Sequence, residues 1–156
     1  MASVRVQGNQ EQAINRGFRS VAGYIFGGNT SSQSIAMTAP VTAESETISM
    51  TTPVTAEMED NGYIVSFMMP HEYTLDELPI PNQKDVQLKE QPATVRAVRT
   101  FSGYAATQRT RQELKLFQQA LTQADIQTTG NFTLAQYNDP WTPGWMRRNE
   151  WWIQID

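Results

Sequence analysis

The sequence predicts an α+β fold, a curved and mostly antiparallel sheet that carries two helices. Apolar residues recur at helical spacing in two segments, and short alternating runs typical of strands surround both segments. The order strand, helix, strand, strand occurs twice along the chain, with few parallel crossovers, which favours α+β over α/β. A length of 156 residues fits one domain, so we expect residues 1–156 to form a single unit.

The first half is predicted to open with a strand over Ala2–Val6, where valines alternate with polar residues. A helix is predicted from Gln10 to about Phe26, because its apolar residues fall on one stripe: Ile14, Phe18, Val21, Ala22 and Ile25. Asn9 is a suitable N-cap residue, and Gly27 with Gly28 favours the end of the helix because glycine accepts positive φ.

A short internal repeat follows this helix. The segment Ile35–Glu44 recurs as Ile48–Glu57, and each copy contains a proline. Proline cannot donate a ladder hydrogen bond and favours an edge strand or a bulge, so we predict two adjacent strands with matched kinks. Another strand is predicted over Tyr63–Met69, after a hairpin turn at Asp60–Gly62.

The second half is predicted to repeat the organisation of the first. A long crossing loop over Pro70–Gln83 leads to two strands, Val86–Glu90 and Thr94–Phe101. The apolar stripe predicts a helix over Arg109–Ile126. The remaining predicted features are a turn at Gly130-Asn131, a strand over Phe132–Tyr137, a proline- and tryptophan-rich loop over Asn138–Trp145 and a strand over Glu150–Ile155.

Composition excludes several classes of function. The net charge is −4 and the chain has only three lysines, so the broad basic surface that nucleic-acid binding uses is missing. The chain has no cysteine and one histidine, which excludes cysteine-based zinc and iron–sulfur sites and any site with two imidazoles. No apolar run approaches the ~20 residues of a membrane span. We therefore expect neither nucleic acid nor a membrane as partner.

The sequence contains none of the common catalytic motifs: neither G-x-S-x-G nor a P-loop nor G-x-G-x-x-G is present. We therefore expect a binding protein rather than an enzyme. The N-terminus shows no secretory signal pattern, which favours a cytoplasmic location.

Methionines and tryptophans are the most informative residues. Six methionines lie inside the chain, and four tryptophans lie within the last sixteen residues, next to Arg147 and Arg148. A cleft of this composition suits a large, flat, apolar ligand that carries carboxylates, because arginine pairs with carboxylate through two hydrogen bonds. A methionine-filled core beneath an aromatic flap fits the same composition.

Several blocks, in order across nearly the whole chain, resemble the SOUL haem-binding protein family. The blocks are Arg16–Asn29, Ile35–Thr42, Phe67–Asn82, Phe101–Gly103, Tyr137–Pro143 and Arg147–Ile153. The resemblance implies a distorted open β-barrel of two repeated βαββ-type halves with two helices. Bacterial effector-binding modules belong to the same superfamily.

The implied function is reversible binding of haem or a related tetrapyrrole, by a carrier or buffer, in an open hydrophobic groove. In relatives the groove lies between the first helix and the loop before the last strand, which correspond here to Ile14–Phe26 and Asn138–Arg148. The cofactor would be exchangeable, because its affinity would rest on apolar burial and propionate pairing.

The resemblance also implies roles for single residues. Apolar surface is expected from Phe18, Ala22 and Ile25, and closure over the macrocycle from Trp141, Trp145 and Met146. The propionates would meet Arg16, Arg19, Arg147 and Arg148, although each arginine is also explained as surface charge, or by pairing with Glu150.

His71 is the only histidine in the sequence, and it is therefore the only candidate for a histidine ligand to iron. The family pattern has no histidine at this position, and an exposed turn residue is the better explanation of His71. Family members usually carry a further strand before the segment that matches Ala2–Val6. Its absence predicts an unpaired sheet edge and a homodimer through that edge, and leaves an organellar or exported origin open.

Two other functions are compatible with the sequence. One is a small-molecule sensor of the gyrase-inhibitor-like type, for which the acidic charge and Glu150 would suit a cationic ligand. The other is a hydrolase that uses Glu150 or Tyr137, which predicts a carboxylate with a raised pKa inside a cleft.

Overall fold

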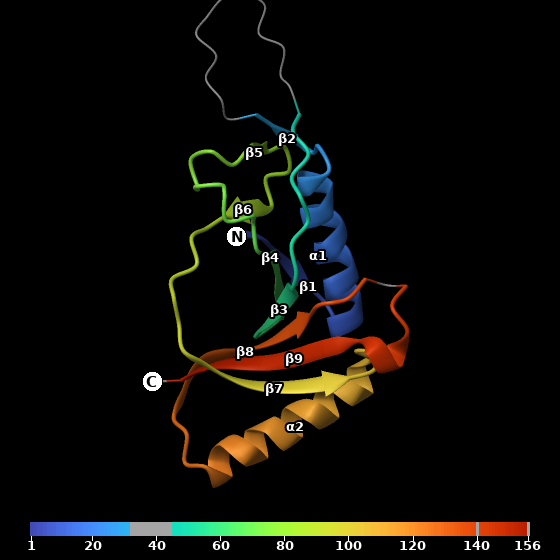
Figure 1. The fold of residues 1–156 in the computed structure, drawn as a ribbon, viewed down its shortest axis with the longest axis vertical. Helices are drawn as coiled ribbons and strands as arrows, with labels where there is room; N and C mark the ends of the chain where they lie inside the picture. Colours follow the sequence, from blue (N-terminus) through green and yellow to red (C-terminus); the bar gives the residue numbers. More distant parts are fainter. Residues whose placement is uncertain (32–44, 140, 156) are drawn as a thin grey trace, which may run out of the picture.

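The computed structural model describes residues 1–31, 45–139 and 141–155. Two helices and one large antiparallel sheet dominate this part of the chain (Figure 1). The elements in chain order are β1 (Ala2–Gln7), α1 (Gln10–Ile25), β2 (Asn29–Thr30), β3 (Val54–Glu59), β4 (Gly62–Phe67), β5 (Ile80–Pro81), β6 (Val86–Leu88), β7 (Arg96–Ser102), α2 (Thr107–Gln123), β8 (Thr128–Gln136), the 3-10 turn η1 (Gly144–Met146) and β9 (Arg148–Ile155).

The sheet joins two halves of equivalent topology. Its strand order is β6-β1-β4-β3-β8-β9-β7. The two halves have the same connectivity, β1-α1-β3-β4 in the first and β7-α2-β8-β9 in the second, and they meet at the antiparallel β3–β8 pair. The predicted α+β class and the strand–helix–strand–strand repeat are confirmed. The sheet is open, with β6 and β7 as its two edges, and it does not close into a barrel.

Helix α1 forms where the apolar period and the cap predict it. The Asn9 Oδ1 accepts a hydrogen bond from the Gln12 amide at 3.0 Å, which satisfies one of the amides that a helix start leaves without a partner. The helix ends at Ile25, and Gly27 follows with a φ of +102°. The buried face of α1 packs on β4, where the backbone of Gly17 lies directly against Val65.

Helix α2 covers the second half of the sheet. Phe117 and Leu121 are buried in one cluster with Trp151 and Ile153 of β9. The helix begins at Thr107 and ends at Gln123, two to three residues earlier at each end than the predicted range.

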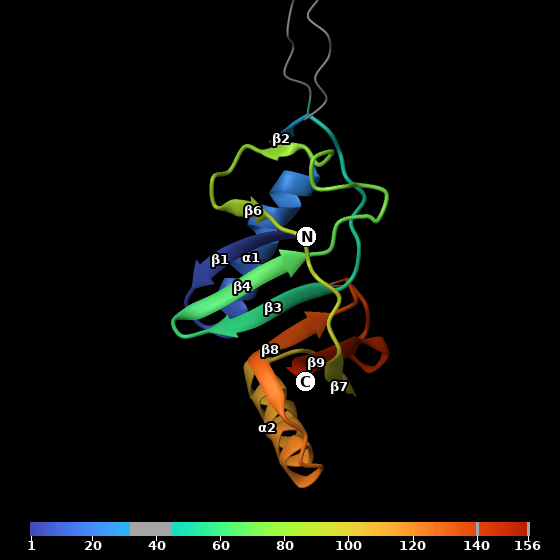
Figure 2. The ribbon, with the colours of Figure 1, turned by 90° about the vertical axis from the view of Figure 1, so that its left-hand side faces the viewer.

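Both helices lie on one face of the sheet. The register places Ala56 of β3 opposite Leu134 of β8, and Leu134 opposite Trp151 of β9. Ala56 belongs to the α1 core, whereas Leu134 and Trp151 belong to the α2 core, so a single apolar face runs across both halves. In Figure 2, α1 lies behind β1, β4 and β3, so this half of the sheet turns its helix-free face toward the viewer.

The predicted kinked strands of the internal repeat need correction. Of the second copy, only the part that follows Pro53 is a strand: β3 starts at Val54 and lies inside the sheet between β4 and β8. Residues 45–53 form no strand, and Thr47 makes a single bridge to Phe26. Proline thus marks the start of a central strand rather than an edge or a bulge. The first copy, Ile35–Glu44, lies outside the described residues.

The predicted turn at Gly130-Asn131 is wrong. Both residues lie within β8, where the pairing with β9 shifts register between Thr129 and Thr133. Gly130 has a φ of +75°, a conformation that occurs in β-bulges as well as in turns. The chain reverses earlier, directly after α2, around Asp125.

The strand that follows the long loop belongs to the first half. β6 pairs with β1 through Ala2–Val4, on the side of β1 away from β4. The predicted unpaired edge at the first strand is therefore wrong, and this edge no longer supports the predicted dimer. β6 and β7 lie at opposite edges of the sheet, and residues 89–95 run between them (Figure 1).

Candidate ligand-binding surface

The loop before β9 presents three large apolar side chains to solvent. Trp141 is 90% exposed, Trp145 81% and Met146 64%. We call residues Trp141–Arg147 the aromatic flap. Figures 1 and 2 show η1, the central part of this flap, at the outer margin of the molecule. The three residues predicted to close over a ligand are thus all exposed on one loop.

The backbone of the flap is tightly hydrogen-bonded. The Asp139 Oδ1 accepts hydrogen bonds from the amides of Trp141 and Thr142, each at 2.8 Å. The Arg147 Nε donates to the Thr142 carbonyl at 2.7 Å. The exposed side chains therefore project from a defined turn.

Three contacts hold the flap on Gly103 and Tyr104, which directly follow β7. The Gly103 amide donates to the Gly144 carbonyl at 3.0 Å. The backbone of Gly144 lies so close to the Tyr104 ring that a Cβ atom there would stand 2.7 Å from the Tyr104 Cε2. The Arg147 guanidinium lies 4.6 Å from the centre of the same ring. Sequence reasoning missed Tyr104, although it directly follows the Phe101–Gly103 block.

On α1 the arginines and the apolar residues point in opposite directions. Arg16 and Arg19 are exposed, and no acidic side chain of the described residues pairs with either. Phe18, Ala22 and Ile25 face the core instead: the Phe18 ring lies 5.5 Å from that of Phe67, and Ile25 has no exposed surface. The surface that α1 offers a ligand is thus polar and cationic.

The side chains predicted to meet a ligand come from two elements, the flap and α1. Trp141, Trp145, Met146 and Arg147 belong to the flap, whereas Arg16 and Arg19 are exposed residues of α1.

His71 lies in the turn after β4 with a fully exposed side chain, and its Nδ1 is 4.0 Å from a carboxylate oxygen of Glu72. Its role as an iron ligand stays a prediction. Within the described ranges, no group of three or more histidine and acidic side chains could hold a metal ion. Likewise, no helix there is long and apolar enough to cross a bilayer.

Glu150 is a buried carboxylate on the face of the sheet that lacks helices. It accepts hydrogen bonds from the Tyr137 hydroxyl and the Trp152 Nε1, both at 2.7 Å, and from the Arg148 Nε at 2.8 Å. Burial alone would raise the pKa of Glu150, but these three donors outweigh it and hold the pKa below its usual value. Burial and the bond to Glu150 raise the pKa of Tyr137 to about 12.

The raised pKa expected of a hydrolase carboxylate is not found at Glu150. Glu150 is ionised and paired with Arg148, whereas a general acid requires a raised pKa. The same pairing neutralises the charge that would attract a cationic ligand.

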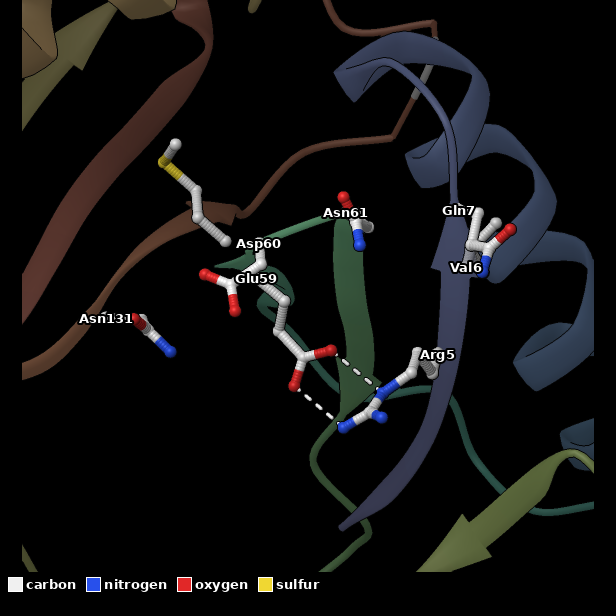
Figure 3. A pocket seen from close by; sticks show the side chains of 9 residues that line it. Arg5, Val6, Gln7, Glu59, Asp60, Asn61 and Asn131 are labelled. Atoms are coloured by element: carbon white, nitrogen blue, oxygen red, sulfur yellow. Dashed lines mark hydrogen bonds and ion pairs between the residues drawn. The ribbon is translucent and has the colours of Figure 1, made fainter.

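Two surface hollows lie around the β3–β4 hairpin, and the smaller one also borders the start of α1 at Asn9 and Gln10. The larger, of about 670 Å³, is lined mainly by polar residues, including Arg5, Glu59 and Asn131 (Figure 3). Arg5 and Glu59 form an ion pair there at 2.8 Å. No motif in the sequence indicated this hollow, and its polar lining does not suit a large apolar ligand.

Comparisons with known proteins place this fold in a family. Heme-binding protein 2 of Homo sapiens is 28% identical over 144 residues, which cover 92% of this chain and 66% of the relative. Heme-binding protein 2 of Mus musculus is 28% identical over 104 residues, which cover 67% of this chain and 47% of the relative. The chain thus spans about half to two thirds of the length of these relatives. A family model described as SOUL heme-binding protein matches residues 1–154, and the chain therefore belongs to the SOUL heme-binding protein family.

Proposed function

We propose that this protein binds haem or a related tetrapyrrole on an open surface and releases it again, as a carrier or buffer. The observation that carries the proposal is the family match over residues 1–154, and both relatives are named for heme binding. The sequence-based expectation of a cytoplasmic, non-catalytic role belongs to the same proposal.

The aromatic flap supplies the apolar contact. A porphyrin is flat and apolar across its ring, and the indoles of Trp141 and Trp145 offer flat, exposed surface of the same kind. Met146 adds an adaptable side chain beside them. These residues fit an open mode of binding, in which one face of the macrocycle stays accessible and exchange is fast.

The exposed arginines of α1 supply the charge. Arg16 and Arg19 are one turn apart, and neither has an acidic partner among the described residues. A ligand carboxylate can therefore pair with them without breaking an existing ion pair. Arg147, which already contacts Tyr104, is a further partner within the flap itself.

Iron ligation contributes little in this proposal. The chain has one histidine, and the structure places it in an exposed turn rather than in a hollow. Affinity then comes from burial of the macrocycle at about 25 cal/mol per Å² and from carboxylate pairing. We therefore expect haemin and metal-free porphyrin to bind with similar affinity.

Titration with haemin and with metal-free protoporphyrin tests this proposal, with Soret absorbance and tryptophan fluorescence as signals. W141A/W145A should weaken both ligands at least tenfold, and R16Q/R19Q should weaken a dicarboxylate porphyrin more than its dimethyl ester. The matched controls are Val98→Ala on β7 and Arg111→Gln on α2, which change exposed side chains on other elements.

Three outcomes would contradict the proposal. The first is no saturable binding of either ligand. The second is strong dependence on iron that His71→Ala abolishes, which would make His71 the ligand. The third is unchanged affinity in W141A/W145A, which would place the tetrapyrrole on another surface.

A further inference from the structure

The aromatic flap combines features that are rarely found together on a protein surface. Its three large apolar side chains are mostly exposed to solvent, yet its backbone is hydrogen-bonded to Asp139, Arg147 and Gly103. The hydrogen-bonded loop therefore keeps these side chains exposed. A cluster of exposed apolar residues is typical of an interaction site. The flap also lies at the margin of the molecule in both ribbon views.

We propose that the aromatic flap docks the protein on the surface of a lipid bilayer, with Trp141, Trp145 and Met146 inserted at the level of the headgroups. Indole rings favour this interface because they combine an apolar body with one polar N–H. Docking requires no membrane-spanning segment, so it is compatible with the short apolar runs of the sequence. The proposal departs from the expectation that a membrane is not a partner.

Four amides of the flap are already hydrogen-bonded within the protein. Backbone groups that enter lipid must be hydrogen-bonded within the protein. The Trp141 and Thr142 amides donate to Asp139, the Met146 amide donates to the Pro143 carbonyl at 3.0 Å, and the Arg147 amide donates to the Gly144 carbonyl at 3.1 Å. Insertion therefore leaves these amides paired.

Charge indicates which lipids the flap prefers. Around the flap, Asp139 and Glu150 balance Arg147 and Arg148, so the local charge is close to zero. The whole chain carries −4, which disfavours an anionic membrane. The proposed partner is thus a neutral, zwitterionic bilayer, bound through apolar contact with little dependence on salt.

A second copy of this chain is a less suitable partner. Aromatic anchors at protein interfaces fill apolar pockets of the partner. The two surface hollows around the β3–β4 hairpin are lined mainly by polar and charged residues such as Arg5, Glu59 and Asp60. They do not suit an indole ring.

The proposal goes beyond tetrapyrrole binding and does not rest on it. Ligand-free protein is the species to test, and the tetrapyrrole titration is done without lipid, so each proposal can fail alone. Flotation with phosphatidylcholine vesicles measures binding, and brominated lipids report on depth through quenching of tryptophan fluorescence. The wild-type protein should float with the vesicles and show a blue-shifted, quenched emission.

The variant W141S/W145S should lose at least tenfold in partitioning. The matched control V98S/L116S also removes two exposed apolar side chains, but from β7 and α2, and should float like the wild type. Unchanged thermal unfolding of W141S/W145S shows that the variant is folded. Raising salt from 0.1 to 0.5 M should change partitioning less than twofold.

Each contrary result overturns the proposal. If wild-type protein stays unbound, or floats only with anionic vesicles, the flap does not dock as argued. If W141S/W145S floats like the wild type, another surface makes the contact. If light scattering shows a wild-type dimer that W141S/W145S abolishes, the flap is a protein interface instead.

Discussion

The Tyr104 ring is the point at which the aromatic flap is held on the sheet. The Arg147 guanidinium lies 4.6 Å from its centre, and Gly144 approaches it too closely for any side chain larger than hydrogen. Tyr104 follows the end of β7, whereas both partners belong to the loop before β9. One ring therefore joins two segments that are distant in sequence, and the order of the flap depends on it.

Replacing Tyr104 by alanine should loosen the flap more than it destabilises the fold. An exposed cation–π contact contributes about 0.5–1 kcal/mol, so the free energy of unfolding should fall by no more than roughly that amount. Hydrogen exchange at the amides of Trp141, Met146 and Arg147 should accelerate several-fold. Tyr104→Phe keeps the ring and should exchange like the wild type. Equal exchange in Tyr104→Ala would show that Asp139 and Gly103 alone hold the flap.

Glu150 should make stability depend on acid pH. Its pKa in the folded protein lies below the usual value, so its contribution is complete above the unfolded pKa of about 4.3 and is lost as the pH falls toward the folded pKa. Glu150→Gln cannot titrate. Urea unfolding should show Glu150→Gln less stable than wild type at pH 7, with a gap that narrows between pH 5 and 3. A constant gap would mean that Glu150 does not ionise differently on folding.

Local pattern predicted the secondary elements well, because the signals lie within the elements. The Asn9 cap and the apolar period of α1 needed no distant residue. The position of β6 beside β1 and the bulge at Gly130 depend on pairing with strands far away in the sequence, which period and turn chemistry do not report. The kink predicted at Pro53 was wrong for the same reason, because the role of this proline depends on where β3 starts.

The candidate site was only partly predictable. The richness in tryptophan indicated the flap, and the structure shows its side chains exposed. The sequence predicts two roles for Phe18, Ala22 and Ile25, one in the apolar stripe of the helix and one in contact with a ligand. In the folded chain the stripe packs on the sheet, so these side chains are in the core and the arginines face solvent. The contact of Tyr104 with the flap had no local signal.

Thr110 links the starts of the two helices through a buried hydrogen bond. Its hydroxyl lies 3.0 Å from both the Gln10 Oε1 and the Thr107 carbonyl oxygen, and its carbonyl accepts from the Trp151 Nε1 at 3.0 Å. Thr110→Val leaves the Gln10 amide oxygen buried without this donor, which should cost about 1–3 kcal/mol in urea unfolding. Thr110→Ser keeps the hydroxyl and should lose only the part due to one methyl group. The double variant Q10L/T110V should lose less than the sum of its single changes. Strict additivity would show that the two side chains are not coupled.

Gly17 fixes how closely α1 approaches the sheet. A Cβ atom at this position would stand 2.5 Å from both the Cβ and the Cγ2 of Val65, which is fully buried in β4. Gly17→Ala gains about 1 kcal/mol of helix propensity but overpacks the core, which costs about 1–3 kcal/mol. We expect a net loss of stability in urea unfolding, because Val65 is held by the sheet and cannot move away.

Gly23 is the matched control, since it lies on the same helix with open space around it. The nearest atom to an added Cβ would be the Gln83 Nε2 at 3.8 Å, so Gly23→Ala should be neutral or stabilising by up to about 1 kcal/mol. Introducing Gly17→Ala into a Val65→Ala background should reduce its cost without removing it, because the Cγ2 is gone while the Cβ remains. If Gly17→Ala stabilises the wild type as Gly23→Ala does, helix and sheet are not in the close contact described, and the core between them is looser than the structure requires.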